Sequence, residues 1–366
     1  MRITYKMMIN NSEYWLSKQR EKLSDAEIVS AAGQVINKPS DDPEGAAHIL
    51  EYRSEIAKYG QYSSNLTEAD DLISAGTDVL DSVNSLLTEA LDLLDSSSSS
   101  SASEATLETA KNLYNQILDL ANTRYSSNYL YGGSQTDTLP FSDEVSVSSG
   151  SAEGIRYYLG SDASAVTITI CDSSGNEVRT LSSSGTSGSN TITWDGKDDS
   201  GNTLSDGDYT FAVSASDSSG NTVASSCYQG DGGKKQIIIG DGNIVTINSN
   251  GGVIFSEALS AISQLIASLE DGTSSDSASA TTKSLNSAVS SIKCEMVALS
   301  NTSSQLGVTT DRVDKLTELY KERLSTVETG SADQAAVELS AQQTAYEVAQ
   351  AATAKILNLP RLSDYL

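Results

Sequence analysis

The sequence has few of the residues that catalytic and metal sites need. Among 366 residues it contains one histidine, three cysteines, two tryptophans and three phenylalanines. A serine–histidine or cysteine–histidine nucleophile would have to use His48, which stands among alanine, isoleucine and leucine on an expected helix. Three cysteines are too few for a disulfide framework and lack metal-site spacing. We therefore expect no catalytic residue, no metal and no cofactor, and a protein that is not an enzyme.

Two weaker possibilities come from the middle of the chain. A single bridge between Cys171 and Cys227 stays open, because both residues flank a β region described below. The loop 195–202 carries several carboxylates that could bind calcium, but it lacks the twelve-residue ligand pattern that ends in glutamate. We interpret its aspartates and asparagine as residues of tight turns.

Basic residues and long apolar runs are also scarce. The chain has 23 Lys and Arg against 49 Asp and Glu, a net charge of −26, and ten acidic but no basic residues stand between Tyr62 and Ala110. Nucleic-acid phosphates and anionic membrane surfaces both need lysine or arginine. No apolar run reaches the roughly 18 residues that span a bilayer, and the first residues lack the apolar stretch of a cleaved signal peptide. We expect no nucleic-acid partner and no membrane partner.

Residues 1–123 and 257–366 contain almost no glycine or proline within apolar stripes of helical period. The strongest stripe alternates steps of three and four, the pattern of a left-handed coiled-coil seam. Gly76 lies in this stripe, where it costs about 1 kcal/mol against alanine but permits a close backbone approach. The seam residues of this predicted rod are Leu66, Ile73, Leu80, Val83, Leu87 and Leu94.

Further helices are predicted on both sides of this stripe. Asp42 as N-cap and Pro43 at the first helical position should open a helix that ends near Tyr59. A helix over 105–122 follows the serines at 96–101, and stripes over 289–327 and 339–356 close the chain. None of these stripes can be buried alone, so we expect the two ends of the chain to pair with each other.

The middle of the chain has the grammar of β-hairpins. Alternating segments at 166–170, 178–181, 191–194 and 207–213 are separated by Gly-Asn and Asp-Gly turns. Several short strands in about 65 residues predict a small β-sandwich with Trp194 and Tyr209 in its core.

These patterns predict a multidomain α+β protein. Its N- and C-terminal helices should pair in a coiled-coil-like rod, and its central β domains should include an immunoglobulin-like β-sandwich. The predicted domains are terminal helices (1–42 plus 335–366), a helical rod (43–132 plus 256–334), a small β domain (133–160 plus 227–255) and an inserted sandwich (161–226).

Several motifs resemble those of the flagellar hook-associated junction proteins, a family related to flagellin. The start Met1-Arg2-Ile3-Thr4 and the segment 35–43 (VINKPSDDP) are similar to its N-terminal signature. Similar motifs occur at 120–123 (LANT), 129–133 (YLYGG), 228–231 (YQGD), 238–242 (IIGDG) and 338–366. Residues from about 161 to 226, notably 193–196 (TWDG) and 207–211 (GDYTF), resemble instead the immunoglobulin-like module of the hook-capping family. We predict that these residues form a domain inserted at an exposed loop. We expect this domain to act as a passive outer spacer.

The resemblance implies a structural adaptor between hook and filament, secreted unfolded through the flagellar type III channel and placed outside the cell. Its implied partners are copies of itself in a ring, the neighbouring hook-associated junction protein, flagellin and an export chaperone. Apolar terminal helices that become ordered on polymerisation would make these contacts. The predicted assembly residues are Ile3, Met7, Tyr14, Ala349, Ile356, Leu359, Leu362 and Tyr365.

Two other functions remain open. A flagellin filament subunit shares the plan of paired ends, although the Asp364-Tyr365-Leu366 finish and the first four residues favour the junction family. A surface adhesin or glycan-binding protein would bind its ligand through the sandwich, but the sequence offers few aromatic residues there that look exposed for stacking on sugars.

Overall fold

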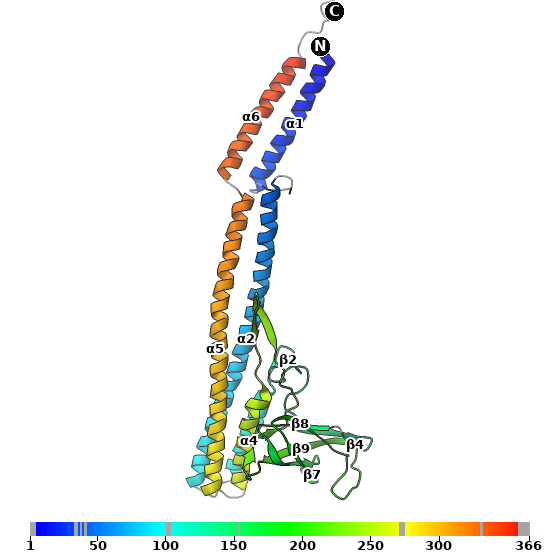
Figure 1. The fold of residues 1–366 in the computed structure, drawn as a ribbon, viewed down its shortest axis with the longest axis vertical. Coiled ribbons are helices and arrows are strands. Elements are labelled where there is room, and N and C mark those ends of the chain that lie inside the picture. The colour runs from blue at the N-terminus through cyan, green and yellow to red at the C-terminus, as the bar shows by residue number, and fades with distance from the viewer. Residues whose placement is uncertain are drawn as a thin grey trace, which may run out of the picture. The chain divides into compact units, whose positions relative to one another are not determined.

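The computed structural model describes residues 5–32, 36, 39, 42–99, 104–152, 154–270, 275–329 and 332–357. The chain forms two compact units, one of residues 1–63 with 311–366 and the other of residues 64–310. Two long helices, α2 (Pro43–Ser99) and α5 (Ser275–Thr329), each contribute to both units. Figure 1 labels several of the elements of both units.

Helix α2 begins as its sequence predicts and ends much later. The Asp42 carboxylate accepts a hydrogen bond from the Glu44 amide at 3.1 Å, which satisfies one of the donors left free at a helix start. The helix then runs without a break to Ser99, so the predicted end near Tyr59 is wrong. The stripe explains the continuity, because buried Ile49 and buried Leu66 are connected at alternating steps of three and four by four half-buried residues, namely Tyr52, Ile56, Tyr59 and Ser63.

In the first unit, α2 and α5 meet through aromatic rings. The rings of Tyr52 and Tyr59 each lie within 6 Å of the Tyr320 ring, at 5.9 and 5.7 Å between centroids. Arg53 forms an ion pair with Glu328 at 2.6 Å. Helices α1 (Tyr5–Ala32) and α6 (Ala332–Leu357) complete this unit.

In the second unit, α2 and α5 pack with two shorter helices, α3 (Glu104–Ala121) and α4 (Gly251–Glu270). The Ser303 hydroxyl donates to the Asp70 carboxylate at 3.0 Å, and the Ser284 hydroxyl of α5 donates to Gln264 of α4 at 2.8 Å. Lys111 of α3 pairs with Glu270 of α4 at 3.2 Å.

Helix α4 is the apolar centre of this unit. It begins at Gly251, capped by the Asn250 side chain, which accepts from the Gly252 amide at 3.0 Å, whereas the sequence analysis resumed the rod at 256. Contrary to the sequence-based expectation, this helix is long and apolar enough to cross a bilayer by length and composition. It is buried against α3 and against the strands β5 (Gly154–Leu159), β8 (Gly188–Thr193) and β11 (Ser225–Ser226), which explains its apolar composition as that of a core helix.

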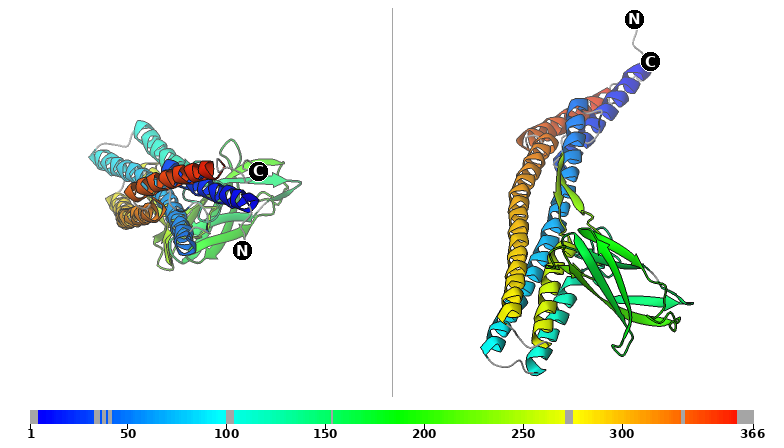
Figure 2. Two further views of the ribbon diagram at one scale, coloured as in Figure 1. Left: turned by 90° about the horizontal axis from the view of Figure 1, so that it is seen from above. Right: turned by 60° about the horizontal axis from the view of Figure 1, so that its bottom comes forward.

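The middle of the chain forms a two-sheet sandwich. One sheet has the order β4 (Ser151–Ala152), β3 (Glu144–Ser148), β9 (Gly207–Ser216), β6 (Ala163–Cys171), β7 (Glu177–Gly185), and β10 (Thr222–Val223) also pairs with β9. The other has the order β11 (Ser225–Ser226), β5 (Gly154–Leu159), β8 (Gly188–Thr193). Figures 1 and 2 show these strands gathered beside the helices of this unit.

The sandwich starts earlier than the sequence analysis placed it. Strand β3 pairs with β9 through Val145 and Tyr209, and β5 pairs with β8 through Ile155 and Ile192. The side chains of Val145 and Ile155 are buried in the same core as Trp194 and Tyr209, as predicted for the latter two. The boundary at 161 is therefore wrong, because the strands before it complete both sheets.

The chain enters and leaves the sandwich at adjacent points. Phe141 and Tyr228 form an antiparallel bridge, and the Ser142 amide donates to the Cys227 carbonyl at 3.2 Å. The Gln229 amide donates to the Pro140 carbonyl at 2.7 Å. Such a closed base is the geometry of a domain inserted into a host fold.

The predicted small β domain is not a separate sheet in the described residues. Its first half supplies β3 to β5 of the sandwich, and its second half forms a hairpin of β12 (Gln236–Gly240) and β13 (Asn243–Thr246). This hairpin lies against α2, where Asn65 donates to the Ile238 carbonyl at 2.7 Å. A second short hairpin joins β1 (Arg124–Tyr125) to β2 (Asn128–Tyr129).

Candidate assembly interface

Helix α1 is partly covered along one stripe of residues that faces α6, and the rest of its surface is exposed. Positions at alternating steps of three and four are less exposed than their neighbours, and only Ala26 among them is buried, at 9% exposure. Two polar residues interrupt the stripe, and the Gln19 Oε1 atom is buried with no hydrogen-bond partner among the described residues. The stripe consists of Ile9, Ser12, Leu16, Gln19, Leu23 and Ala26.

Helix α6 has a half-buried stripe of the same period. The two helices contact each other, and Figure 1 shows them side by side with the start of α1 and the end of α6 at the same end, so they run antiparallel. No residue of the described part of α6 is fully buried. Its half-buried stripe consists of Leu339, Gln342, Tyr346, Ala349, Thr353 and Ile356.

The outer faces of this pair carry large apolar side chains in contact with solvent. On α1 the rings of Tyr14 and Trp15 meet edge to face with centroids 5.7 Å apart, and both side chains are 57% exposed. Burial of one such side chain contributes about 1.5–3 kcal/mol, so this surface gains stability from any apolar partner. The exposed apolar residues of the pair are Met7, Tyr14, Trp15, Ile28, Val337, Val348 and Leu357.

The rod seam of the second unit, unlike the stripes of α1 and α6, is fully buried. All six predicted seam residues of α2 are buried, with no more than 2% of any side chain exposed. Buried residues of α3, namely Leu113 and Ile117, and of α5, namely Ile292 and Leu299, complete this core. The rod therefore satisfies its stripe within one chain, and the α1–α6 pair does not.

The structure separates the eight predicted assembly residues into three groups. Met7 and Tyr14 lie on the outer face, whereas Ala349 and Ile356 lie in the half-buried stripe of α6. The remaining four, Ile3, Leu359, Leu362 and Tyr365, lie outside the described residues. The two terminal helices contact each other, as the sequence analysis expected of the two ends of the chain.

Five outer residues were missed, namely Trp15, Ile28, Val337, Val348 and Leu357. A signal for Trp15 was present in the sequence. Adjacent positions point about 100° apart on a helix, so Tyr14 and Trp15 cannot both enter one narrow seam.

Three turns of the sandwich share one design, which accounts for the acidic loops. In each turn an aspartate accepts from the backbone amide and side chain of the asparagine four residues later, and a glycine between them has a positive φ. These hydrogen bonds hold the pKa of each aspartate below its ordinary value of 3.8. We refer to these residues as the turn aspartates: Asp172, Asp198 and Asp217.

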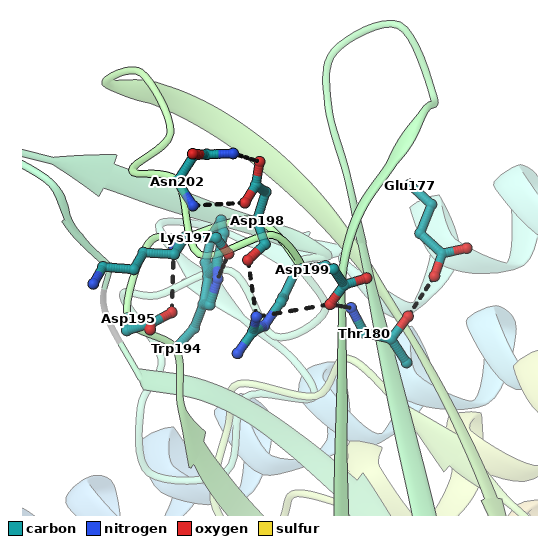
Figure 3. A network of polar contacts seen from close by, with 9 residues as sticks. Glu177, Thr180, Trp194, Asp195, Lys197, Asp198, Asp199 and Asn202 are labelled. Carbon is teal, nitrogen blue, oxygen red and sulfur yellow. Dashed lines mark hydrogen bonds and ion pairs between the residues drawn. The ribbon is translucent and has the colours of Figure 1, made fainter.

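The loop considered for calcium is occupied by internal contacts (Figure 3). Asp195 accepts from the Lys197 amide at 3.3 Å, while Asp199 lies 3.7 Å from Arg179 and accepts from the Thr180 amide at 3.3 Å. The carboxylates thus serve different donors. Within the described residues, no three His, Cys, Asp or Glu side chains gather in a way that could hold a metal ion.

The other candidate groups have packing or surface roles. His48 is exposed, stacks on the Tyr52 ring at 5.9 Å, and has Nδ1 3.4 Å from Glu51. The thiols of Cys171, Cys227 and Cys294 are all free. Burial raises the pKa of the Cys227 thiol to about 12, and the charge of Asp143 adds to the effect.

Comparison with known proteins agrees with this division of the chain. Residues 3–136 match the family model of the bacterial flagellin N-terminal helical region. Residues 142–223 match the FlgD Ig-like domain, a span that begins close to β3 and ends at β10.

Individual relatives come from the same two groups. The chain is 31% identical to flagellar hook-associated protein 3 of Escherichia coli K12 over 172 residues, which is 45% of this chain and 54% of that protein, or about half its length. Bacillus cereus FlgL is 14% identical, with a TM-score of 0.41, over 77% of this chain and 99% of its own. Xanthomonas campestris FlgD is 20% identical, with a TM-score of 0.22, over 30% of this chain and 80% of its own. The chain is thus similar to flagellar hook-associated protein 3 over about half of that protein, resembles bacterial flagellin in its N-terminal helical region, and matches the FlgD Ig-like domain in its middle.

Proposed function

We propose that the protein is a secreted structural subunit of the bacterial flagellum that joins hook to filament, and that it assembles through α1 and α6. It acts by binding other subunits and not by catalysis. Its partners in this role are further copies of itself, the neighbouring hook-associated protein and flagellin. An export chaperone would cover the terminal helices before assembly.

One observation supports this proposal above the others, namely the contrast between two helical surfaces of the same chain. The seam of the rod is closed, with Leu80 and Leu87 fully buried, whereas the stripes by which α1 and α6 face each other are half-buried apart from Ala26. A helix pair that buries its own stripe only in part, and that also exposes Trp15 and Val348, gains stability when an assembly covers it. The relation to hook-associated protein 3 supplies the setting for that assembly.

The test replaces exposed apolar residues and asks whether filaments still grow. A Tyr14→Ser, Trp15→Ser variant should be exported and folded but should release unassembled flagellin into the medium, because the junction cannot form. The matched control is Val308→Ser on α5, a residue that is 72% exposed outside the α1–α6 pair and should leave filaments normal. Removal of residues 340–366 should likewise stop filament growth while the β region stays folded. Normal filaments on cells with either terminal variant would refute the proposal.

We propose further that the sandwich is an outer spacer that assembly does not need. Because Ser142 and Cys227 are hydrogen-bonded neighbours, residues 143–226 can be removed and the ends joined through two or three glycines. Filaments should persist on cells that carry this shortened chain. Loss of filaments, with the shortened chain folded and exported, would assign the sandwich a part in the junction.

The copy number separates this role from that of a filament subunit. A junction protein is present in a few copies per flagellum and a flagellin in thousands, so quantitative mass spectrometry of sheared flagella decides between them. An adhesin role would require binding of the intact chain on a glycan array, and it would be lost in the chain without residues 143–226.

A further inference from the structure

A pocket of the second unit lies outside both the sandwich and the α1–α6 pair. Its volume is about 300 Å³, at the lower end of the range of roughly 300–1,000 Å³ that small-molecule sites occupy. Its walls come from α2, from the β1–β2 hairpin with the segment that follows it, and from the chain on either side of the β12–β13 hairpin. The proposed role in the flagellum makes no use of this pocket.

The shape of the pocket is fixed by the fold itself. The side chain of Asn248 donates to the Gly233 carbonyl at 2.9 Å and accepts from the Lys235 amide at 2.8 Å. Asn248 therefore holds two wall segments together and has a structural role. The apolar part of the lining is buried or half-buried and consists of Leu72, Leu130 and Ile247.

The β1–β2 hairpin presents one aromatic ring and one amide to the pocket. Tyr125 and Asn128 lie directly opposite each other in the register of this hairpin, so their side chains are neighbours. Both line the pocket, and Tyr125 is 36% exposed. Within the described residues, the Tyr125 hydroxyl and the Asn128 Nδ2 atom form no hydrogen bond, and the Tyr125 ring has no aromatic or cationic partner. The pair thus has a ring and polar atoms that remain available to a ligand.

The turn of the same hairpin holds a hydroxyl at the pocket. Ser126 lines the pocket and has a φ of 57°, a backbone conformation that glycine adopts freely and other residues seldom adopt. Its hydroxyl forms no hydrogen bond in the part of the chain that the structure describes. Residues in such conformations concentrate at ligand sites, and glycine at this position would remove the hydroxyl.

The charges of the lining favour a neutral ligand. Glu68 and Lys235 are its charged residues, and they pair with each other at 3.5 Å. The nearby Asp231 carboxylate already accepts from the Ser134 and Gly233 amides at 2.7 and 3.0 Å. An anion or a cation would therefore meet no surplus of the opposite charge. The charged residues next to lining residues in the sequence are balanced as well, namely Asp71 and Asp137 against Arg124 and Lys234.

We propose that this pocket binds a neutral sugar ring, with Tyr125 as its platform. The face of an aromatic ring carries negative charge density, which attracts the slightly positive C–H groups on one face of a sugar. Each sugar hydroxyl can both donate and accept, so it can pair with the hydroxyls of Tyr125 and Ser126, with the Asn128 amide and with the Glu68–Lys235 pair. An apolar side chain of another protein would cover these polar groups without pairing them, which costs free energy.

Saturation-transfer difference NMR on the full chain tests the site with defined probes. The sugar probes are glucose, galactose, mannose and N-acetylglucosamine, each as the reducing sugar and as the methyl glycoside. We expect transfer to the ring C–H protons of at least one of them, strongest on the sugar face that rests on Tyr125. Transfer to both forms would identify the end of a glycan as the source, and transfer to the reducing form alone would identify a free sugar.

Substitutions assign the binding to the pocket. Tyr125→Ala should lower the affinity at least about ten-fold, because it removes the platform. Tyr125→Phe keeps the ring and Asn128→Ala removes the amide, so each should lower the affinity by about two- to ten-fold, the effect of one hydrogen bond. The matched control is Leu139→Ala, at a residue that is 41% exposed and outside the lining, and it should bind as the original chain does. Calorimetry of the second unit shows which variants are folded, and Tyr125→Phe and Asn128→Ala decide the test if Tyr125→Ala is not.

Three results would overturn the inference. The first is no transfer to any of the sugars. The second is transfer that the folded pocket variants leave unchanged, which would place the sugar elsewhere, for instance on the sandwich. The third is transfer to N-acetyltyrosinamide or N-acetylneuraminic acid but to no neutral sugar, which would assign the pocket to a protein side chain or to an anion. The junction role is tested separately, by filament growth in the Tyr14→Ser, Trp15→Ser variant.

Discussion

The seam glycine of α2 allows a quantitative test of how the rod is packed. Gly76 is buried in the seam, and its carbonyl accepts a hydrogen bond from the Tyr131 hydroxyl at 3.0 Å. A glycine there permits a close backbone approach, but the structure leaves room for a side chain. A Cβ added at Gly76 would lie 3.7 Å from Leu299 Cδ1 and 3.8 Å from the Tyr131 hydroxyl. Both are ordinary van der Waals distances.

We therefore expect Gly76→Ala to stabilise the second unit. Alanine is favoured over glycine within a helix by about 0.8–1.0 kcal/mol, and the new methyl group contacts Leu299 without displacing it. For a unit of about 250 residues, a gain of 1 kcal/mol raises Tm by about 2–4 °C. Gly76→Leu should lower Tm instead, because overfilling a packed core costs about 1–3 kcal/mol.

Calorimetry of the full chain measures the transition of this unit. The matched control is Gly307→Ala on α5, a position where an added Cβ meets nothing within 4 Å, so it should gain from helix propensity alone. A lower Tm for Gly76→Ala together with a higher Tm for Gly307→Ala would refute the packing argument, because it would mean that the seam has no room for a methyl group at position 76.

Three further predictions concern the β region and its base. Replacement of all three turn aspartates by asparagine should remove an acid-dependent loss of sandwich stability. The pKa values of these aspartates in the folded protein lie below the ordinary 3.8. The charged carboxylates therefore stabilise the fold above pH 3.8, and this stabilisation disappears as the pH falls through their folded pKa values. Circular dichroism melts between pH 5 and pH 2 should show this loss in the original chain and a flatter profile in the variant. Tyr131→Phe should destabilise the second unit by about 0.5–1.5 kcal/mol in urea, because it removes the buried hydrogen bond to Gly76; an unchanged midpoint would contradict that role. Gly133→Ala should cost at least about 2 kcal/mol, because Gly133 has a φ of 71° and its added Cβ would collide with the Asp231 carbonyl; a variant with the original Tm would show that this turn can relax.

Local patterns in the sequence were enough to predict the rod seam and several strands. Leu66 and Leu94 stand at the ends of an unbroken stripe, and the burial of every predicted seam position follows from that period. The N-cap at Asp42 was predicted from two adjacent residue types, and its hydrogen bond to Glu44 is present. These features depend on neighbours within one or two helical turns.

Features that depend on distant partners were not predictable in the same way. Strand β3 belongs to the sandwich because it pairs with β9, about sixty residues later, and nothing in its own five residues distinguishes that partner from another. The ring that stacks on Tyr59 of α2 is likewise distant in sequence, since it belongs to Tyr320 of α5. For the assembly face, the amphipathic stripe of α1 was visible, but the side of the helix that its own chain would cover depended on α6.

The bridge between Phe141 and Tyr228 gives the molecule a practical property. Because the residues that flank the sandwich lie this close, the sandwich can be replaced by another domain whose own termini are adjacent, such as a fluorescent protein, an enzyme or an epitope. The length and register of the helices would not change. Each cargo would be displayed once per subunit, and in the proposed junction role the number of displayed copies would equal the number of subunits. The same closed base would let one inserted domain replace another while the helical scaffold stays unaltered.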